Sequence, residues 1–478
     1  MVSPEVEPFA KTGGLGDVLG SLPKELARLG HDVRVMMPKY GVIPEKYQKE
    51  MVFIDKTYTK VAWRDQYVGA YELKKDGVIY YFLDNEYYFK NGGIYSGDYD
   101  LERFSFFSRA SLEILQTINF FPDILHCHDW QAAAIPVLWE YFYSWQKDYK
   151  DIKTVFTIHN LRFQGEHCIP HINDLLGLPL HYFAADKVGV GNGDANLIKA
   201  GIVFADFVTT VSPTYAREIM TPEFGEGLDR VLRSKEFKLG GILNGIDYSV
   251  YSPKKNKSVN YNYETYSAVE GKALNKKTLQ KKLGLPVRDD IPLISIVSRL
   301  TSQKGIDIIL YALNELMGED VQFVVLGTGD ANFENSFKHF AWIYKEKFSA
   351  NISFSNKLSH QIYAGSDMFL MPSLYEPCGL GQLIALSYGT IPIVRETGGL
   401  KDTVSSYNEE TGEGNGFSFA PYNAGDMMWT IRRALEFYKD KKVWNKIVES
   451  AMQSDYSWTA SAGHYINIYD GLINKETE

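Results

Sequence analysis

The sequence is poor in cysteine and has no long apolar run. Its cysteines, Cys127, Cys168 and Cys378, are widely spaced and odd in number, which fits neither a disulfide framework nor a paired-cysteine zinc site. No apolar run approaches the roughly 20 residues that a membrane-spanning helix needs, and the first residues lack the basic and then apolar pattern of a secretory signal. We therefore expect a protein of the reducing cytoplasm.

Positive charge is also scarce. The 50 lysines and arginines stand against 59 aspartates and glutamates, which gives a formal net charge of -9. Nucleic acid and anionic membranes are bound through basic faces that displace counterions, so neither is expected as the main partner. A neutral polymer meets no such repulsion. The 32 tyrosines and 8 tryptophans could stack on sugar rings, but a large aromatic core explains them more simply.

At 478 residues the chain exceeds one compact core, since domains usually hold about 100–200 residues. Short β-branched runs stop at Gly, Ser, His or Asn and pass into helical periodicity, which is typical of βαβ units and parallel sheets. The predicted strands form two groups, 33–37, 124–128, 154–158 and 207–211, followed by 293–297, 322–326, 368–371 and 391–394.

A polar stretch, Ser252–Lys277, separates the two groups and is predicted to join them. Apolar residues at helical spacing in Trp458–Ile473 predict a closing amphipathic helix. We therefore divide the chain into an N-terminal domain (1–250), a C-terminal domain (251–457) and a C-terminal helix (458–478) that is expected to pack on the N-terminal domain.

Polar residues and glycines collect where the predicted strands end, which is the edge at which open parallel sheets bind ligands. Lys11 and the glycines after it lead into a predicted helix at Asp17, so free N–H groups there could face an anion. A tight turn explains the glycines equally well. Such a loop normally follows a complete strand, so either the strand within Met1–Pro8 is unusually short or the numbering begins inside the natural protein.

Charged side chains also follow the strands of the second group. Arg299 and Lys304 flank a strand-to-helix turn, from which a guanidinium and an ammonium could grip one diphosphate. A solvated basic corner is the simpler interpretation of this pair alone. Glu376 precedes a helix predicted to start near Leu380, where its carboxylate could accept hydrogen bonds from sugar hydroxyls or act as an ordinary cap.

Four histidines could form a metal site. His126 and His128 share one face of a predicted strand, and His167 and His171 could complete the ligand set. The strand should be buried between helices, however, and a hydrogen-bonded neutral imidazole is commoner there. We favour this second interpretation and expect no metal.

Taken together and in order, these strand ends resemble the glycogen and starch synthases, a family of glycosyltransferases. Each motif is weak evidence alone, but the set is highly specific and spans nearly the whole chain. The matching segments are K-T-G-G-L-G-D-V at Lys11–Val18, H-C-H-D-W at His126–Trp130, T-I-H-N at Thr157–Asn160, V-T-T-V-S-P-T-Y-A at Val208–Ala216, L-N-G-I-D at Leu243–Asp247, S-R-L-T-S-Q-K-G at Ser298–Gly305, E-P-C-G-L at Glu376–Leu380 and T-G-G-L-K-D-T-V at Thr397–Val404.

The resemblance implies an α/β fold of the GT-B type, in which two facing Rossmann-like domains hold the active site in the cleft between them. The N-terminal domain would bind the acceptor and the C-terminal domain the nucleotide sugar. The implied reaction transfers glucose from ADP-glucose to the non-reducing end of an α-1,4-glucan with retention of configuration, without a metal or other cofactor. Bacterial glycogen and plastid starch contexts fit equally well, and the oligomeric state stays open.

The resemblance also implies roles for individual residues. The donor diphosphate would be held by Lys11, Arg299 and Lys304 together with the backbone of Gly13 and Gly14. The donor glucose would be held by Glu376 and the N–H groups of Cys378, Gly379 and Leu380, in a pocket lined by Asp17, Asp129 and Asn244. His159 would place its main-chain carbonyl beneath the anomeric carbon, and Phe354 would face the adenine.

Three alternatives stay open. A related transferase that uses UDP-glucose to make a small oligosaccharide would carry a second glutamate where this chain has Ile384. A glucan phosphorylase would need a Schiff-base lysine for pyridoxal phosphate, for which the sequence offers no strong candidate. A non-catalytic glucan-binding protein derived from a synthase is disfavoured because the chain retains Lys11, His159, Arg299, Lys304 and Glu376 together.

Glucosyl transfer is predicted to survive exhaustive chelation, because Arg299 and Lys304 supply the positive charge that a metal would otherwise bring to the diphosphate. Product formation before and after treatment with EDTA tests this expectation. Loss of transfer with EDTA and its recovery with one specific divalent ion would show that the histidine cluster had been misinterpreted.

Overall fold

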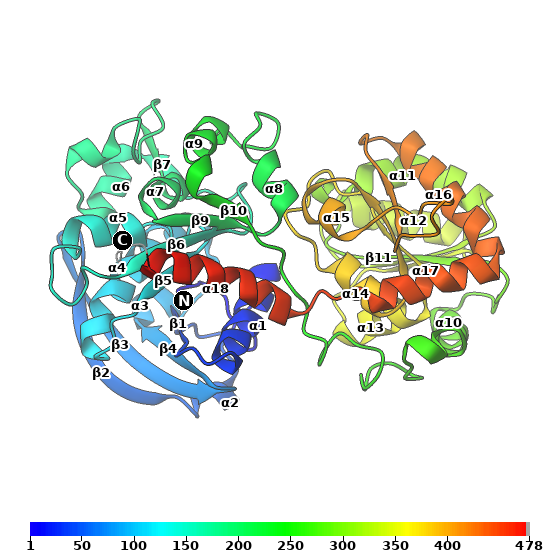
Figure 1. Cartoon of the computed structure of the whole chain (residues 1–478), viewed down its shortest axis with the longest axis horizontal. Helices are drawn as coiled ribbons and strands as arrows, with labels where there is room; N and C mark the ends of the chain where they lie inside the picture. Colours follow the sequence, from blue (N-terminus) through cyan, green and yellow to red (C-terminus); the bar gives the residue numbers. More distant parts are fainter. Residues whose placement is uncertain (475–478) are drawn as a thin grey trace. The chain divides into compact units, whose positions relative to one another are not determined.

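The computed structural model describes residues 1–474, apart from the side chain of Asp98, and Figure 1 shows the course of the chain. The chain splits into two compact units. Unit 1 holds Met1–Gly245 and the chain from Trp458 onward, and unit 2 holds Ile246–Ser457. The division therefore lies between Gly245 and Ile246, earlier than the boundary predicted after residue 250. None of the helices within residues 1–474 is long and apolar enough to cross a membrane.

Two four-stranded sheets form the centre of unit 1. Val2 bridges Cys127 in one sheet and Met36 in the other, so the first residues act as a very short strand between them. One sheet is parallel throughout, in the order β10 (Leu239–Gly241), β9 (Phe207–Thr210), β6 (Lys153–Ile158) and β5 (Ile124–His128). In the other, β1 (Arg34–Pro38) is parallel to β4 (Val78–Asp84), followed by antiparallel β3 (Arg64–Lys75) and β2 (Val52–Val61).

The last helix, α18 (Trp458–Asn474), lies beside α1 (Gly14–Arg28) in unit 1 (Figure 1). Thr459 Oγ1 donates to Glu25 Oε1 at 2.6 Å, and Ser461 Oγ donates to Leu243 O at 2.7 Å. The other elements of unit 1 are α2 (Glu45–Gln48), α3 (Glu86–Phe89), α4 (Asp100–Thr117), α5 (Ile135–Phe142), α6 (Ile169–Leu176), α7 (Leu197–Phe204), α8 (Pro213–Glu218), α9 (Asp229–Ser234) and the antiparallel pair β7 (Glu166–Cys168) and β8 (Asp194–Asn196).

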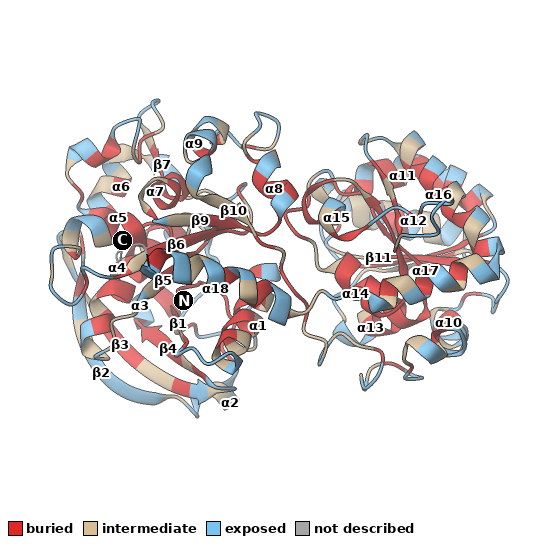
Figure 2. Ribbon diagram, in the orientation of Figure 1, coloured by how far each residue is buried: buried red, intermediate tan, exposed pale blue. Residues whose placement is uncertain are grey.

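Unit 2 is built on a six-stranded parallel sheet, in the order β13 (Phe348–Asn351), β12 (Gln322–Leu326), β11 (Leu293–Val297), β14 (Met368–Met371), β15 (Ile391–Arg395) and β16 (Phe417–Phe419). Its helices are α10 (Ala268–Leu283), α11 (Ile306–Gly318), α12 (Ala331–Ile343), α13 (Asn356–Gly365), α14 (Gly381–Ser387), α15 (Gly398–Thr403), α16 (Ala424–Lys439) and α17 (Lys441–Gln453). The strands of the parallel sheets and the inward helix faces are mostly buried in both units, whereas β2 is largely exposed (Figure 2). Polar groups can therefore gather mainly at the strand ends.

All eight predicted strands are confirmed, and no end differs by more than one residue. The prediction missed the antiparallel run of β2, β3 and the adjoining β4, and the short strands β7, β8, β10, β13 and β16.

The prediction for the joining segment is partly wrong. The segment belongs to unit 2, and α10 begins within it at Ala268. Lys272 Nζ donates to Thr390 Oγ1 at 2.7 Å, and Lys276 Nζ pairs with Asp367 Oδ2 at 2.7 Å. The buried face of α10 thus carries lysines, so it lacks the apolar periodicity by which an amphipathic helix is recognised.

Replacing Lys276 by Met is predicted to destabilise unit 2 by about 3–5 kcal/mol, because it leaves a largely buried carboxylate without its counter-charge. The side chains of Lys276 and Asp367 are only 6% and 14% exposed. Urea denaturation followed by tryptophan fluorescence measures the loss. Lys439→Met is the matched control, since its pair with Glu436 is 69% and 70% exposed and should contribute less than about 1 kcal/mol. Equal midpoints for the two variants would contradict the prediction.

Candidate functional site

In unit 1 the parallel strands β5 and β6 end side by side and bring three histidines together. His126 and His128 lie on β5, and His159 directly follows β6. His128 Nδ1 lies 3.0 Å from His159 Nε2, and the rings of His126 and His128 have centroids 4.0 Å apart. Burial lowers the pKa of all three imidazoles, that of His159 to about 3, so the cluster is neutral near pH 7.

Asp129 shapes the turn after β5. Its φ of +56° places it in the left-handed region, which is uncommon for residues other than glycine. Its Oδ1 accepts the backbone N–H of His159 at 2.7 Å and that of Asn160 at 3.4 Å, which ties the ends of β5 and β6 together. Burial raises the pKa of Asp129 to about 7, although these N–H groups oppose the shift.

One of the four histidines considered as metal ligands already has protein partners at both ring nitrogens. His126 uses both ring nitrogens, Nδ1 with Tyr469 OH at 2.7 Å and Nε2 with Thr157 Oγ1 at 2.6 Å. The rings of His167 and His171 lie close together but tilted by 40°, with centroids 4.5 Å apart. Across the described part of the chain, no three His, Cys, Asp or Glu side chains are grouped so that they could hold a metal ion.

The glycine loop before α1 already binds a carboxylate of the chain itself. Glu5 Oε2 accepts the N–H of Thr12 at 2.6 Å and that of Gly13 at 3.1 Å. Glu5 Oε1 accepts from Thr12 Oγ1 at 2.7 Å and from the hydroxyl of Tyr95. Helix α1 begins at Gly14 without a side-chain cap, earlier than predicted. The loop therefore presents N–H groups to an anion, and in this structure Glu5 supplies it.

Two further predicted residues of unit 1 pair with each other. Lys11 Nζ lies 2.5 Å from Asp17 Oδ1, and burial raises the pKa of Asp17 while Lys11 opposes the shift. Asn244 follows β10 and is buried, with an Oδ1 that has no partner among residues 1–474. Buried amide oxygens without a partner are uncommon in folded proteins, so Asn244 is suited to accept a hydrogen bond from a ligand.

In unit 2 a lysine and a glutamate meet at the ends of β11 and β14. Lys304 Nζ lies 2.5 Å from Glu376 Oε2, which also accepts from Ser373 Oγ at 3.1 Å. The two paired side chains are 17% and 7% exposed. Arg299 follows β11 and is exposed, and its guanidinium makes no hydrogen bond or ion pair to the described residues. It is therefore open to an incoming anion.

The loop that contains Cys378, Gly379 and Leu380 is held from two sides. Gln382 Nε2 donates to Cys378 O and to Gly379 O at 3.0 Å each. Gly399 at the start of α15 donates its N–H to Glu376 O at 3.2 Å. A Cβ atom on Gly399 would lie 2.1 Å from Cys378 O, so this close approach requires glycine.

Phe354 lies between β13 and α13 with 87% of its surface exposed, so its ring takes no part in the core. Neither Phe354, Arg299 nor Asn244 is joined to another predicted site residue by a hydrogen bond or ion pair within the described residues. The structure does join Lys11 to Asp17, Asp129 to His159 and Lys304 to Glu376.

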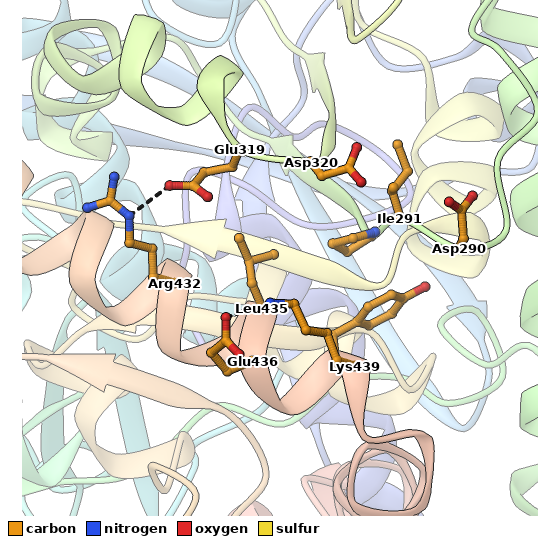
Figure 3. Close-up of a pocket in the computed structure, with 10 residues that line it drawn as sticks. Asp290, Ile291, Glu319, Asp320, Arg432, Leu435, Glu436 and Lys439 are labelled. Atoms are coloured by element: carbon orange, nitrogen blue, oxygen red, sulfur yellow. Dashed lines mark hydrogen bonds and ion pairs between the residues drawn. The ribbon is translucent and has the colours of Figure 1, made fainter.

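A shallow depression lies at the other end of the strands of unit 2 (Figure 3). It includes Pro292 and Asp320, which precede β11 and β12. Its cations are already neutralised, since Arg432 Nε lies 2.7 Å from Glu319 Oε1 and Lys439 pairs with Glu436 at 2.7 Å. Because it lies away from the carboxyl ends of the strands, it is separate from the candidate site.

Comparison with known proteins identifies the family. The model of the starch synthase catalytic domain matches residues 1–234, and that of glycosyl transferases group 1 matches residues 275–450. The glycogen synthase of Geobacillus thermodenitrificans is 52% identical over 472 residues, which cover 99% of this chain and 97% of that protein. The chain belongs to the glycogen and starch synthase family. The glycogen synthase of Clostridium perfringens is also 52% identical, over 98% of this chain and 97% of its own.

A solved structure of a starch synthase agrees with this assignment. The catalytic domain of starch synthase IV from Arabidopsis thaliana, bound to ADP and acarbose, has a TM-score of 0.92 at 34% identity, and 99% of each chain is covered. A sucrose-phosphate synthase from Thermosynechococcus elongatus has a TM-score of 0.63 at 17% identity over 98% of each chain, which shows a shared fold only. The resemblance and the GT-B fold class are thus confirmed, and this chain is a glycosyltransferase.

Two residues that organise the site of this synthase-family chain were missed from the sequence. Glu5 was missed because a lone glutamate ahead of a glycine loop has no distinctive spacing. Arg103 is buried and donates to Gly93 O at 3.1 Å, Ser96 Oγ at 2.7 Å and Asp100 Oδ1 at 2.6 Å. It thereby holds the loop that carries Tyr95, and only the folded contacts reveal this function.

Replacing Asp129 by Asn is predicted to change how the stability of unit 1 depends on pH. Since folding raises the pKa of Asp129 to about 7, its favourable contribution is complete below the unfolded pKa of about 4 and is lost as the pH rises through about 7. Asn keeps an acceptor for the N–H of His159, tolerates positive φ and does not ionise.

Between about pH 4 and pH 7 the wild-type protein should lose stability relative to Asp129→Asn by up to about 1.4 kcal/mol per pH unit. Thermal melts across this range measure the difference, with the exposed Asp151→Asn as control. A difference in Tm that stays constant with pH would contradict the assignment.

Proposed function

We propose that this chain transfers glucose from ADP-glucose to the non-reducing end of an α-1,4-glucan with retention of configuration. The observation that carries the proposal is the paired Lys304 and Glu376 at the strand ends of unit 2, with the exposed Arg299 after the same strand as Lys304. The family and the relatives named glycogen synthase support the acceptor. The ADP and acarbose bound to the Arabidopsis relative support the nucleotide and the glucan-like ligand.

In this reaction, cationic side chains would stabilise the departing diphosphate, and oxygen lone pairs would stabilise the positively charged sugar. Cleavage of the bond between the anomeric carbon and the phosphate oxygen leaves negative charge on the diphosphate and oxocarbenium character on the sugar. Lys11, Arg299 and Lys304 would face the diphosphate. The main-chain carbonyl of His159 would face the anomeric carbon, and the neutral imidazole of His159 adds no repulsive charge there.

Retention follows when the acceptor attacks from the face that the diphosphate leaves. The acceptor hydroxyl oxygen forms the new bond to the anomeric carbon, and its proton passes to a departing phosphate oxygen. Arg299 and Lys304 stabilise the charge of the diphosphate, so we propose that no metal takes part.

Binding of the donor would exchange partners within ion pairs that already exist. Lys304 would move its ammonium from Glu376 to phosphate, and Glu376 would then accept hydrogen bonds from the glucose, together with the N–H groups of Cys378, Gly379 and Leu380. Lys11 would leave Asp17 in the same way, and Asp17, Asp129 and Asn244 would line the sugar pocket. A diphosphate on the glycine loop at Gly13 and Gly14 would compete with the Glu5 carboxylate for the N–H of Gly13.

Purified protein offered either ADP-glucose or UDP-glucose with glycogen is predicted to use ADP-glucose at least tenfold better, measured as kcat/KM from nucleotide release. The reason is the exposed ring of Phe354, since stacking of a base on an aromatic side chain is worth about 1–3 kcal/mol and purine has the larger face. Phe354→Ala should remove most of the preference, whereas Phe237→Ala, at a similarly exposed ring of unit 1, should not. Equal use of both donors would overturn the nucleotide assignment, and no transfer from either would leave a non-catalytic glucan-binding protein.

Glu376→Ala is predicted to lower kcat by about 10²–10³, while ADP binds as tightly as before or more tightly. The variant loses a group that contacts the glucose, and it frees Lys304 Nζ from its partner at 2.5 Å. Lys304→Ala should instead lower both kcat and the affinity for ADP, since the ammonium would contact phosphate throughout. Calorimetric ADP titration and initial rates give the two quantities. If ADP affinity falls as far as kcat in Glu376→Ala, then Glu376 supports nucleotide binding and not the sugar.

A further inference from the structure

A buried chain of hydrogen bonds runs from α18 into the sheet of unit 1. The hydroxyl of Tyr469 lies 2.7 Å from His126 Nδ1, and His126 Nε2 lies 2.6 Å from Thr157 Oγ1. Thr157 Oγ1 in turn lies 2.5 Å from Thr209 Oγ1. His126 is 1% exposed, so both of its nitrogens need these protein partners. The last helix therefore fixes the orientation of the His126 ring.

The His126 ring also packs against the ring of His128. The two rings lie with centroids 4.0 Å apart and planes inclined by 31°, so His128 cannot turn freely without moving His126. His128 Nδ1 is bonded to His159 Nε2 at 3.0 Å. A continuous set of contacts thus connects α18 with the side chain of His159.

The bond between the two imidazoles also decides where His159 carries its proton. A neutral imidazole has one N–H and one acceptor nitrogen, and burial keeps both rings neutral. If His128 Nδ1 donates, His159 accepts at Nε2 and must carry its proton on Nδ1. If His159 Nε2 donates, its Nδ1 is an acceptor.

The remaining nitrogen of His128 favours the first arrangement. His128 Nε2 is buried and has no partner among residues 1–474. Buried N–H groups without an acceptor are rarer than acceptors without a donor. Nε2 is therefore assigned as the unprotonated nitrogen, the proton of His128 lies on Nδ1, and His159 Nδ1–H is left as a donor that makes no hydrogen bond to the described residues.

We propose that Tyr469, His126 and His128 are positioning residues that hold His159 in one orientation and one tautomer, with Nδ1–H directed to an oxygen of the bound sugar. This inference rests on the proposed function for the identity of the ligand. The tautomer itself is a property of the free protein and can be measured without any activity.

The decisive comparison is His128→Asn with His128→Leu. The side-chain amide of Asn can occupy the position of Nδ1 and donate to His159, whereas Leu fills similar space and donates nothing. Side-chain ¹⁵N NMR of histidine-labelled protein reports the tautomer, and the signals of His159 are assigned by their loss in His159→Gln. We expect a single Nδ1–H tautomer in the wild type and in His128→Asn, and a mixture or the opposite tautomer in His128→Leu.

Kinetics should follow the same order. His128→Leu is expected to lower kcat about tenfold, the effect of about 1.4 kcal/mol, with the Kd of ADP changed less than about threefold. His128→Asn should recover most of that loss. Tyr469→Phe removes one neutral hydrogen bond and should lower kcat about threefold to tenfold. His464→Leu, an exposed change on α18, is the control and should leave kcat unchanged.

Several results would overturn the inference. An unchanged His159 tautomer in His128→Leu would show that His128 does not set it, and equal losses in His128→Asn and His128→Leu would show that the ring acts only by packing. If His128→Leu does not fold, Tyr469→Phe decides the question through the same NMR signal and kcat. If the wild type transfers no glucose, the proposed function fails while the NMR comparison still tests the positioning of His159.

Discussion

Helices cover both faces of the parallel strands, so the polar groups of the candidate site lie mainly at the strand ends. Strands such as β6 and β14 are buried along nearly their whole length, where an unpaired charge would be costly. The helices that cover the strands leave only the edges for charged groups, and the connections at the carboxyl edge are glycine-rich and polar. The depression at the opposite edge of unit 2 is lined by ion-paired side chains and lies away from these connections.

At these edges charged groups of the protein pair with one another. Lys11 is paired with Asp17, Lys304 with Glu376, and the glycine loop with Glu5. Each arrangement avoids the large cost of leaving a partly buried charge alone. A donor with a diphosphate and a sugar offers replacement partners of both kinds, because phosphate suits the lysines and hydroxyls suit the carboxylates. Under the proposed function, these pairs would therefore lose little when they exchange partners with the donor.

The sequence predicts the buried strands well and the exposed ones poorly. The runs that became β11 and β14 are apolar throughout and are bounded by polar residues, which makes them distinctive. Strands β2 and β3 carry lysines and tyrosines on a half-exposed face, so the search for continuous apolar runs passed over them. Helix α10 was obscured in the opposite way, because Lys272 and Lys276 are buried in it.

Sequence patterns also predict only part of the candidate site. The motifs predict which residues a ligand contacts, such as Lys304 and Glu376, because the family pattern contains them. Partners from distant segments have no such mark, and the bond from Tyr469 to His126 joins residues 343 positions apart. Nor could the motifs show that the site residues pair with one another, since pairing depends on distances that only the folded chain defines.

In both units, side chains outside the candidate site restrain the loops at the strand ends. In unit 2 the ammonium of Lys272 lies 3.4 Å from Ala364 O in the last turn of α13 and 3.2 Å from Tyr388 O at the end of α14. This donor satisfies carbonyl groups at the ends of two helices, although burial lowers the pKa of Lys272 to about 7. Since α14 begins directly after Cys378, Gly379 and Leu380, anchoring its far end restrains the loop. Tyr469 supports the histidines of unit 1 in a comparable way. In the proposed reaction, Lys11, Lys304 and Glu376 would exchange partners through side-chain movements on a backbone that such contacts restrain.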